Sequence, residues 1–314
     1  MSVSAQMPVR TQVRNFGLKN TYVWLTVMVL LWGSSWPITK LALQSVPPLW
    51  LATIRFSSAA LCLFMYLMIR GKLKLPVAKD LPIIASVGLL QMMAFTGLGL
   101  VAMVHIDTSR AVLLAYTTPL WCVLAAWLIF RETPSRMQVS ALLIGLMGIA
   151  VVCSPGELDW SSTDTVLGAV FLLLAAISWA IVILHIKRHH WVTSPLVLAP
   201  WQMLLATVPL AIAATLTEGS PTTIEMSAGL LEELFFIGPV ATSACFVISA
   251  EFGRRVSTFG MSNFTLGVPL VGIVFSCLTL EATVSGMFLL GLCLVVFGVV
   301  IAALVARNTA RSEL

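Results

Sequence analysis

The sequence has 314 residues, of which 59% are hydrophobic and 10% are charged. Soluble domains contain about 25% charged residues, so this composition excludes a soluble globular protein and indicates an integral membrane protein. The net charge of +5 fits basic loops beside a membrane and gives no reason to expect a nucleic-acid partner.

Ten apolar segments follow one another along the chain, each long enough to cross a membrane as a helix. A hydrocarbon core of ~30 Å requires about 20 helical residues. Breakers such as Pro47-Pro48 and Pro155-Gly156 separate the segments. We therefore predict an all-α integral membrane protein with ten transmembrane helices between short tails at 1–21 and 307–314. The segments cover residues 22–43, 48–69, 81–104, 108–130, 136–153, 165–186, 194–216, 230–250, 256–278 and 283–306.

The basic residues predict how these helices are oriented. Cytoplasmic loops carry an excess of Lys and Arg. With both termini in the cytoplasm, every basic residue falls on that side except Lys40, Arg55 and Arg110. The sequence thus predicts a multi-pass protein of the cell (inner or plasma) membrane with cytoplasmic N- and C-termini. It would lie in the lipid bilayer as a monomer or a homodimer.

A stretch near the start of the chain occurs a second time. Residues 32–56 align with residues 179–203 at a shift of 147 positions. Such a duplication in an apolar chain is typical of transporters built from two repeats. Because each repeat, 22–153 and 165–306, holds five helices, the second is expected to enter the membrane from the opposite side, as an inverted repeat. The identical pairs include Trp32 and Trp179, Lys40 and Lys187, Pro48 and Pro195, Leu49 and Leu196, Leu51 and Leu198, and Ala52 and Ala199.

Several motifs resemble those of a known family. They are a Trp-x-x-x-x-Pro/Leu-x-x-Lys element in each half, a proline-rich turn, the Arg55-Phe56 pair, a proline in the fourth helix and a glutamate after the fourth and ninth helices. In these features the chain is similar to the drug/metabolite transporter (DMT) superfamily and, within it, to the EamA family of ten-helix permeases. The resemblance implies a central cavity between helices one to four and six to nine, with helices five and ten peripheral. It also implies alternating access and transport of amino acids, drugs or other metabolites.

Two basic residues are predicted at membrane depth. Arg55 lies seven residues after the outer start of the second helix, about 10 Å into the bilayer at ~1.5 Å per residue. An arginine inside a membrane costs roughly 2.5–3.5 kcal/mol on insertion scales and usually faces a bundle interior or a cavity. The alternative is that its side chain reaches the outer headgroups. Lys40 is nearer the surface, where the same alternative is stronger.

Four polar residues are expected within apolar helices: Gln91, Tyr116, Gln202 and Asn263. Each either lines a cavity or hydrogen-bonds to a neighbouring helix, a contribution of ~0.6 kcal/mol. Gln202 matches Arg55 in the duplication, so the two halves are expected to differ in chemistry.

Aromatic residues supply a further candidate surface. Trp179 is expected in an aromatic wall of the cavity, whereas Trp36 and Trp201 fit either such a wall or an interfacial belt.

Three prolines, Pro37, Pro119 and Pro269, are expected inside helices, where each removes a backbone hydrogen bond and favours a kink. Membrane helices tolerate such kinks without function. Pro119 and Pro269 nevertheless occupy matched positions, which predicts hinge or gate roles. The glycines of the fifth and tenth helices are expected to allow close packing: Gly145, Gly148, Gly291 and Gly298.

These observations favour a small-molecule permease over an enzyme. The six cysteines and four histidines lack metal or redox spacing, so we expect no cofactor, no metal and no catalytic residue. Arg55 offers a positive charge to a carboxylate, and Tyr116 and Trp179 offer a wall to an apolar body, which points to export of amino acids or related amphiphilic metabolites. The alternatives are a multidrug or other metabolite exporter and, more remotely, an intramembrane enzyme. Because no acid is predicted deep in a helix, we expect transport without strong proton coupling.

Overall fold

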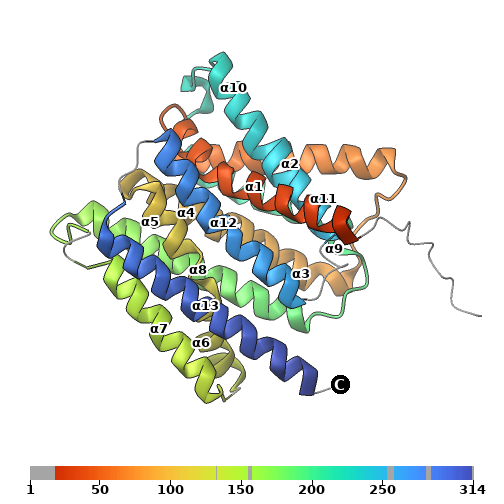
Figure 1. Cartoon of the computed structure of the whole chain (residues 1–314). Helices are drawn as coiled ribbons and strands as arrows, with labels where there is room; N and C mark the ends of the chain where they lie inside the picture. The colour runs from red at the N-terminus through yellow and green to blue at the C-terminus, as the bar shows by residue number, and fades with distance from the viewer. Residues whose placement is uncertain (1–17, 132, 155–157, 253–257, 281–283, 313–314) are drawn as a thin grey trace, which may run out of the picture.

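The chain folds into a bundle of helices (Figure 1). The computed structural model describes residues 18–131, 133–154, 158–252, 258–280 and 284–312, and all regular structure in these ranges is helical. Within them, six helical stretches are long and apolar enough to cross a membrane. The predicted all-α class is therefore confirmed, whereas the number of ten transmembrane helices stays a prediction. The six stretches are Pro48–Ile69, Ala78–His105, Thr108–Ile129, Thr163–Arg188, Pro195–Thr217 and Ala228–Ser249.

The helices follow the order of the predicted segments. In the first half they are α1 (Leu18–Ala42), α2 (Pro48–Ile69), η1 (Ala78–Asp80), α3 (Leu81–Ala85), η2 (Ser86–Phe95), α4 (Thr96–His105), α5 (Thr108–Ala115), α6 (Thr118–Phe130) and α7 (Arg136–Val152). In the second half they are α8 (Thr163–Arg188), α9 (Pro195–Thr217), η3 (Pro221–Thr223), α10 (Ala228–Phe235), η4 (Phe236–Ala244), α11 (Cys245–Phe252), α12 (Thr258–Thr279) and α13 (Gly286–Ser312).

Two helices of the bundle widen in the middle. α3, η2 and α4 run without interruption, as do α10, η4 and α11, and both η2 and η4 are π-helical. A π-helical turn takes more residues than an α-helical one and occurs often at functional sites. The two stretches begin 150 positions apart, at Ser86 and Phe236. Both halves therefore contain a π-helical stretch at the matching position. The sequence analysis did not predict either stretch.

The predicted helix 108–130 is broken. α5 ends at Ala115 and α6 begins at Thr118, so Pro119 lies in the first turn of α6. The expectation that Pro119 lies inside a helix is therefore wrong. The physical reason is that a proline in the first turn removes no helical hydrogen bond, so it favours the start of a new helix. Pro37 and Pro269 do lie inside continuous helices, α1 and α12.

The contacts between the two halves are reciprocal. α1 packs on α12 and on η4 with α11, while α8 packs in the corresponding way on α6 and on η2 with α4. α2 contacts η4 just as α9 contacts η2. The remaining large contacts, α2 with α9 and α7 with α13, join corresponding helices of the two halves. The largest contacts between helices therefore occur in matching pairs in the two halves.

α7 and α13 pack closely because glycines face each other. A Cβ on Gly148 would lie 2.7 Å from the Val295 nitrogen and 2.8 Å from the Gly291 carbonyl oxygen. A Cβ on Gly298 would lie 2.8 Å from the Ala141 carbonyl oxygen. The predicted packing role of these glycines is confirmed.

Two carboxylates tie helix starts to the opposite half of the chain. Glu218, directly after α9, accepts hydrogen bonds from the backbone nitrogens of Leu49 (2.8 Å) and Trp50 (3.0 Å) in the first turn of α2. Asp80, which is fully buried, accepts from Val192 (3.2 Å) and Thr193 (2.9 Å) just before α9. The N–H groups in the first turn of α2 have no partner within the helix, so the carboxylate of Glu218 satisfies them well, whereas Asp80 holds the backbone of the connection before α9. α9 is thus anchored near both of its ends.

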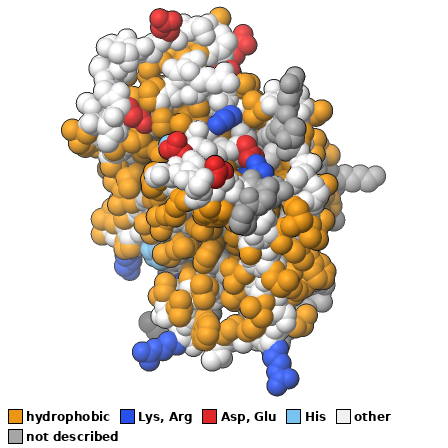
Figure 2. Space-filling model, turned by 90° about the vertical axis from the view of Figure 1, so that its left-hand side faces the viewer, with side chains coloured by type: hydrophobic (Ala, Val, Ile, Leu, Met, Phe, Trp, Pro, Cys, Tyr) orange, Lys and Arg blue, Asp and Glu red, His pale blue; other side chains and the backbone are white. Residues whose placement is uncertain are grey.

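Figure 2 shows how charge is distributed on one face of the molecule. Hydrophobic side chains form a broad band. Acidic side chains gather at one end of the band, whereas most of the visible Lys and Arg side chains project from the other end. This distribution is typical of a protein that lies across a membrane.

Candidate functional site

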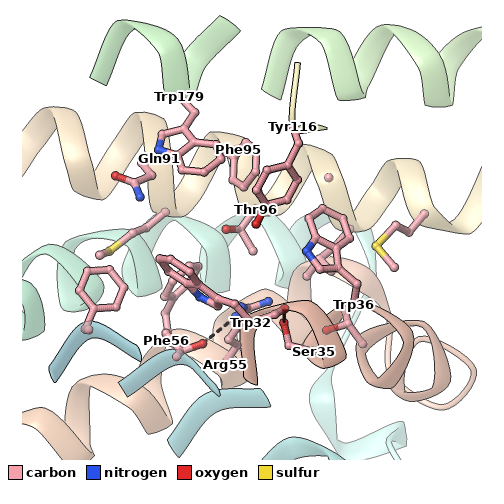
Figure 3. Close-up of a pocket in the computed structure, with 17 residues that line it drawn as sticks. Trp32, Ser35, Trp36, Arg55, Phe56, Gln91, Phe95, Thr96, Tyr116 and Trp179 are labelled. Carbon is pink, nitrogen blue, oxygen red and sulfur yellow. Dashed lines mark hydrogen bonds between the residues drawn. The ribbon is translucent and has the colours of Figure 1, made fainter. Parts of the chain in front are cut away.

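A cavity of about 100 Å³ lies among helices of both halves (Figure 3). This volume is smaller than the ~300 Å³ at the lower end of small-molecule pockets, so a bound metabolite would need more space than the described conformation offers. The lining residues are Trp32, Ser35, Trp36 and Thr39 of α1, Arg55 and Phe56 of α2, Gln91, Met92 and Phe95 of η2, Thr96, Gly99, Leu100 and Met103 of α4, Tyr116, Trp179 of α8, Thr242 of η4, and Phe246 of α11.

Arg55 supplies the positive charge of this cavity. Its Nε donates a hydrogen bond to Oγ1 of Thr242 at 2.9 Å, across the contact between α2 and η4. Among the residues that the structure describes, no acid forms an ion pair with Arg55. Arg55 lines the cavity (Figure 3), so its terminal nitrogens can reach an anionic group there.

Aromatic rings form the wall opposite Arg55 (Figure 3). Tyr116 lies at the break between α5 and α6, with its ring centroid 6.1 Å from that of Trp36 and 5.9 Å from that of Trp179. Trp179 in turn contacts Phe95 at 4.8 Å. Such tilted and edge-on pairs stabilise one another by about 0.5–1.5 kcal/mol beyond their buried area. The wall is therefore largely apolar, with the Tyr116 hydroxyl as a polar group.

Four of the predicted binding residues meet in this cavity: Arg55, Gln91, Tyr116 and Trp179. Lys40 lies just outside the lining, where its Nζ donates to the backbone oxygen of Met103, a lining residue.

The other predicted residues lie elsewhere. Gln202 is buried in α9 with 3% of its surface exposed, and it is not among the lining residues. Asn263 lies in α12, in the part where side chains are outside the described residues. Pro37 and Pro269 are buried, and neither they nor Pro119 lines the cavity. Trp201 lies away from it, with its ring against Phe64.

The sequence reasoning missed several lining residues. Trp32 could have been found, because it is the duplicate of Trp179 and both members of the pair line the cavity. Trp36 fits a cavity wall and an interfacial belt equally well by sequence, and the structure places it in the cavity lining. Thr242 reaches the cavity from the π-helical segment η4, and a period of 3.6 residues does not predict which side chains such a segment turns inwards. The remaining polar members, Ser35, Thr39 and Thr96, have no distinctive signal in the sequence.

Known proteins resemble this chain over most of its length. A model of the EamA-like transporter family matches residues 19–154 and again residues 166–304. The "Uncharacterized inner membrane transporter YedA" of Escherichia coli (strain K12) is 27% identical over 285 residues, which cover 89% of this chain and 89% of that protein. The "Uncharacterized transporter YvbV" of Bacillus subtilis (strain 168) is 26% identical over 276 residues, with 88% and 89% covered.

A third relative has a more specific name. The "Probable amino-acid metabolite efflux pump" of Escherichia coli (strain K12) is 25% identical over 285 residues, covering 88% of this chain and 92% of that protein. A solved crystal structure aligns with a TM-score of 0.63 and 20% identity over 92% of this chain and 97% of its own, a likeness that shows the fold. The predicted resemblance is confirmed, and the chain is a multi-pass membrane protein that belongs to the EamA-like transporter family.

Proposed function

We propose that this protein carries small amphiphilic metabolites with a carboxylate across the cell membrane by alternating access. The observation that carries the proposal is Arg55, whose guanidinium enters a cavity with an aromatic wall. The arginine matches an anionic group, and Trp36, Tyr116 and Trp179 match an apolar or aromatic body. Amino acids and closely related metabolites combine both features.

The direction that we propose is export. One relative is named as an efflux pump for an amino-acid metabolite, and this name supports both the direction and the substrate class. A multidrug exporter is the second candidate, which the apolar character of most lining residues favours.

The architecture that we propose is ten transmembrane helices in two inverted repeats, 22–153 and 165–306, with both termini in the cytoplasm. The two matches of the family model, at 19–154 and 166–304, support this division. The reciprocal contacts between the halves support the inverted arrangement. The separation of acidic and basic ends in Figure 2 supports the orientation.

Reconstituted protein tests the proposal directly. Proteoliposomes would be loaded with a panel of amino acids, their carboxylate metabolites and cationic drugs, and the exchange of each labelled compound would be followed. We expect saturable exchange of amphiphilic carboxylates. Exchange confined to the cationic drugs would reject the carboxylate carrier in favour of the second candidate, and no exchange above empty liposomes would reject both.

Pro119 and Pro269 are expected to act as flexible points of two gates. Pro269→Ala should straighten α12, and Pro119→Ala should let α5 and α6 join, because alanine restores a backbone donor and favours a helix. The two changes should bias the carrier towards opposite faces. Labelling of a Ser35→Cys reporter, in a background without the six native cysteines, by impermeant thiol reagents from either side would measure the bias.

A proline outside the gates provides the control for this experiment. Pro209 lies inside α9, and Pro209→Ala should leave the labelling ratio at its starting value. If Pro119→Ala and Pro269→Ala also left it there, the prolines would have no gating role.

Transport is expected to run down the substrate's own gradient. Arg55 is the one charged side chain among the lining residues that the structure describes, and proton-coupled carriers commonly use an ionisable acid at membrane depth. A pH gradient imposed on proteoliposomes should therefore cause no accumulation against the substrate gradient. Accumulation driven by pH alone would contradict this expectation, and His185, which lies 2.7 Å from Oγ of Ser86, would be the first residue to replace.

A further inference from the structure

The guanidinium of Arg55 is held from one side. Arginine has one N–H on Nε and four on its two terminal nitrogens. Oγ1 of Thr242 accepts the hydrogen bond of Nε at 2.9 Å. A carboxylate can bind arginine sideways, through Nε and one terminal nitrogen, or end-on through both terminal nitrogens. Because Nε is occupied, the end-on arrangement is the one left open.

The direction of this hydrogen bond is fixed by the backbone of η4. The hydroxyl of Thr242 donates its proton to the carbonyl oxygen of Ile237, five residues earlier, at 2.7 Å. A hydroxyl has one proton, so Thr242 faces Arg55 as an acceptor. Thr242 is 2% exposed, so water cannot easily take its place.

Gly238 brings Thr242 close enough to reach Arg55. A Cβ at Gly238 would lie 2.1 Å from Oγ of Ser58 and 3.1 Å from the carbonyl oxygen of Arg55. The close approach of η4 to α2 therefore requires glycine at this position.

The other half of the molecule repeats this contact with different side chains. Gly88 in η2 lies 150 positions before Gly238, and its Cβ would lie 2.8 Å from the carbonyl oxygen of Gln202 in α9. In this copy Gln202 stands at the position of Arg55, and Met92 at that of Thr242. The same backbone contact thus forms without an arginine or a threonine, so packing alone does not require the Arg55–Thr242 pair.

We infer that Thr242 is a positioning residue that holds Arg55 for end-on binding of a substrate carboxylate. The inference rests on the proposed function and extends it to a specificity rule. The carrier selects a planar group with two acceptor oxygens, and it discriminates against the amide of the same compound, which has one. Only the first half of the chain contributes an arginine to this recognition, because the corresponding contact between η2 and α9 has Gln202 and Met92 in place of Arg55 and Thr242.

Replacement of Thr242 in the full-length protein tests this inference. Phenylalanine, 3-phenylpropionate and phenylalaninamide serve as probes in proteoliposome exchange. Thr242→Val keeps the shape of the side chain but removes the acceptor, and Thr242→Ser keeps the hydroxyl. We expect valine to raise KM for the two carboxylates about tenfold, as for a lost hydrogen bond to a charged group. The maximal rate should stay within about twofold, and the preference for acid over amide should shrink. Serine should restore both values.

A neighbouring hydroxyl provides the control. Ser243 belongs to the same π-helical stretch and donates to the Ala59 carbonyl oxygen of α2 at 3.1 Å, outside the cavity lining. Ser243→Ala should leave KM and the acid-to-amide preference unchanged. If Thr242→Val does not fold, Thr242→Ala provides the same comparison.

The outcomes separate this inference from the function on which it rests. An unchanged KM in Thr242→Val, or an equal loss in the valine and serine variants, would overturn the positioning role while the carrier function stands. Wild-type protein that exchanges neither carboxylate would reject the proposed substrate class itself.

Discussion

Arg55→Ala is expected to abolish most of the transport while the protein still folds and reaches the membrane. The side chain is the charged group of the cavity wall, and its terminal nitrogens are the donors available to an anionic substrate. Truncating one partner of a buried, charged hydrogen bond typically costs 2–5 kcal/mol, which corresponds to a loss of roughly thirtyfold or more. The initial rate of carboxylate exchange, corrected for the amount of protein in the liposomes, measures this loss.

The variant Arg55→Lys separates the contribution of the charge from that of the guanidinium geometry. Lysine keeps the charge but lacks the planar fork that binds both oxygens of a carboxylate. It should therefore transport at a level between those of the wild type and Arg55→Ala, with weaker discrimination between acid and amide. If Arg55→Ala transported carboxylates with wild-type kinetics, the arginine would have no part in binding, and the central claim about the cavity would be wrong.

Gly148→Leu is expected to separate α7 from α13 and to destabilise the protein strongly. Even a Cβ at this position would lie 2.7–2.8 Å from backbone atoms of α13, and backbone cannot move aside as a flexible side chain can. Overpacking of this kind costs about 1–3 kcal/mol or more. Thermal unfolding of the detergent-purified protein should show a clearly lowered midpoint.

A glycine in open space gives the matched control. A Cβ on Gly286, at the start of α13, meets no atom within 4 Å, so Gly286→Leu should unfold near the wild-type temperature. Because neither α7 nor α13 contributes a described residue to the cavity, folded Gly148→Leu should retain the wild-type KM. A wild-type unfolding midpoint in Gly148→Leu would mean that the two helices pack less closely than the structure indicates.

The sequence predicted a cavity residue correctly where a single strong physical constraint applied to that residue. Arg55 is an example, because an arginine in an apolar helix is costly unless it faces the interior, and it does line the cavity. Trp179 is a second example, because it lies more than a turn from either end of α8, away from an interfacial belt, and it also lines the cavity. Lys40, nearer the surface, instead hydrogen-bonds to a backbone oxygen.

What escaped prediction depends on backbone geometry. Thr242 was not predicted, and it reaches Arg55 through a π-helical turn. Tyr116 was predicted as a cavity residue, but not the break between α5 and α6 at which it lies. Neither irregularity has a reliable signature in the sequence, since Pro119 fitted a kinked helix as well as a new helix start. Gln202 shows the limit of the duplication as a guide. Its position matches Arg55, but the structure buries it outside the cavity lining.

The anchoring of α9 near both of its ends bears on whether solutes could leak through a state that is open to both sides of the membrane. An opening that separates α2 from the end of α9 would break the bonds of Glu218, and an opening at the other end that separates Asp80 from the segment before α9 would break the second set. Hydrogen bonds to charged groups are each worth about 1.5–3 kcal/mol. A state open at both ends would lose both sets at once, so its population would fall at least about tenfold below that of either singly open state. The two carboxylates would thus keep a carrier from becoming a pore.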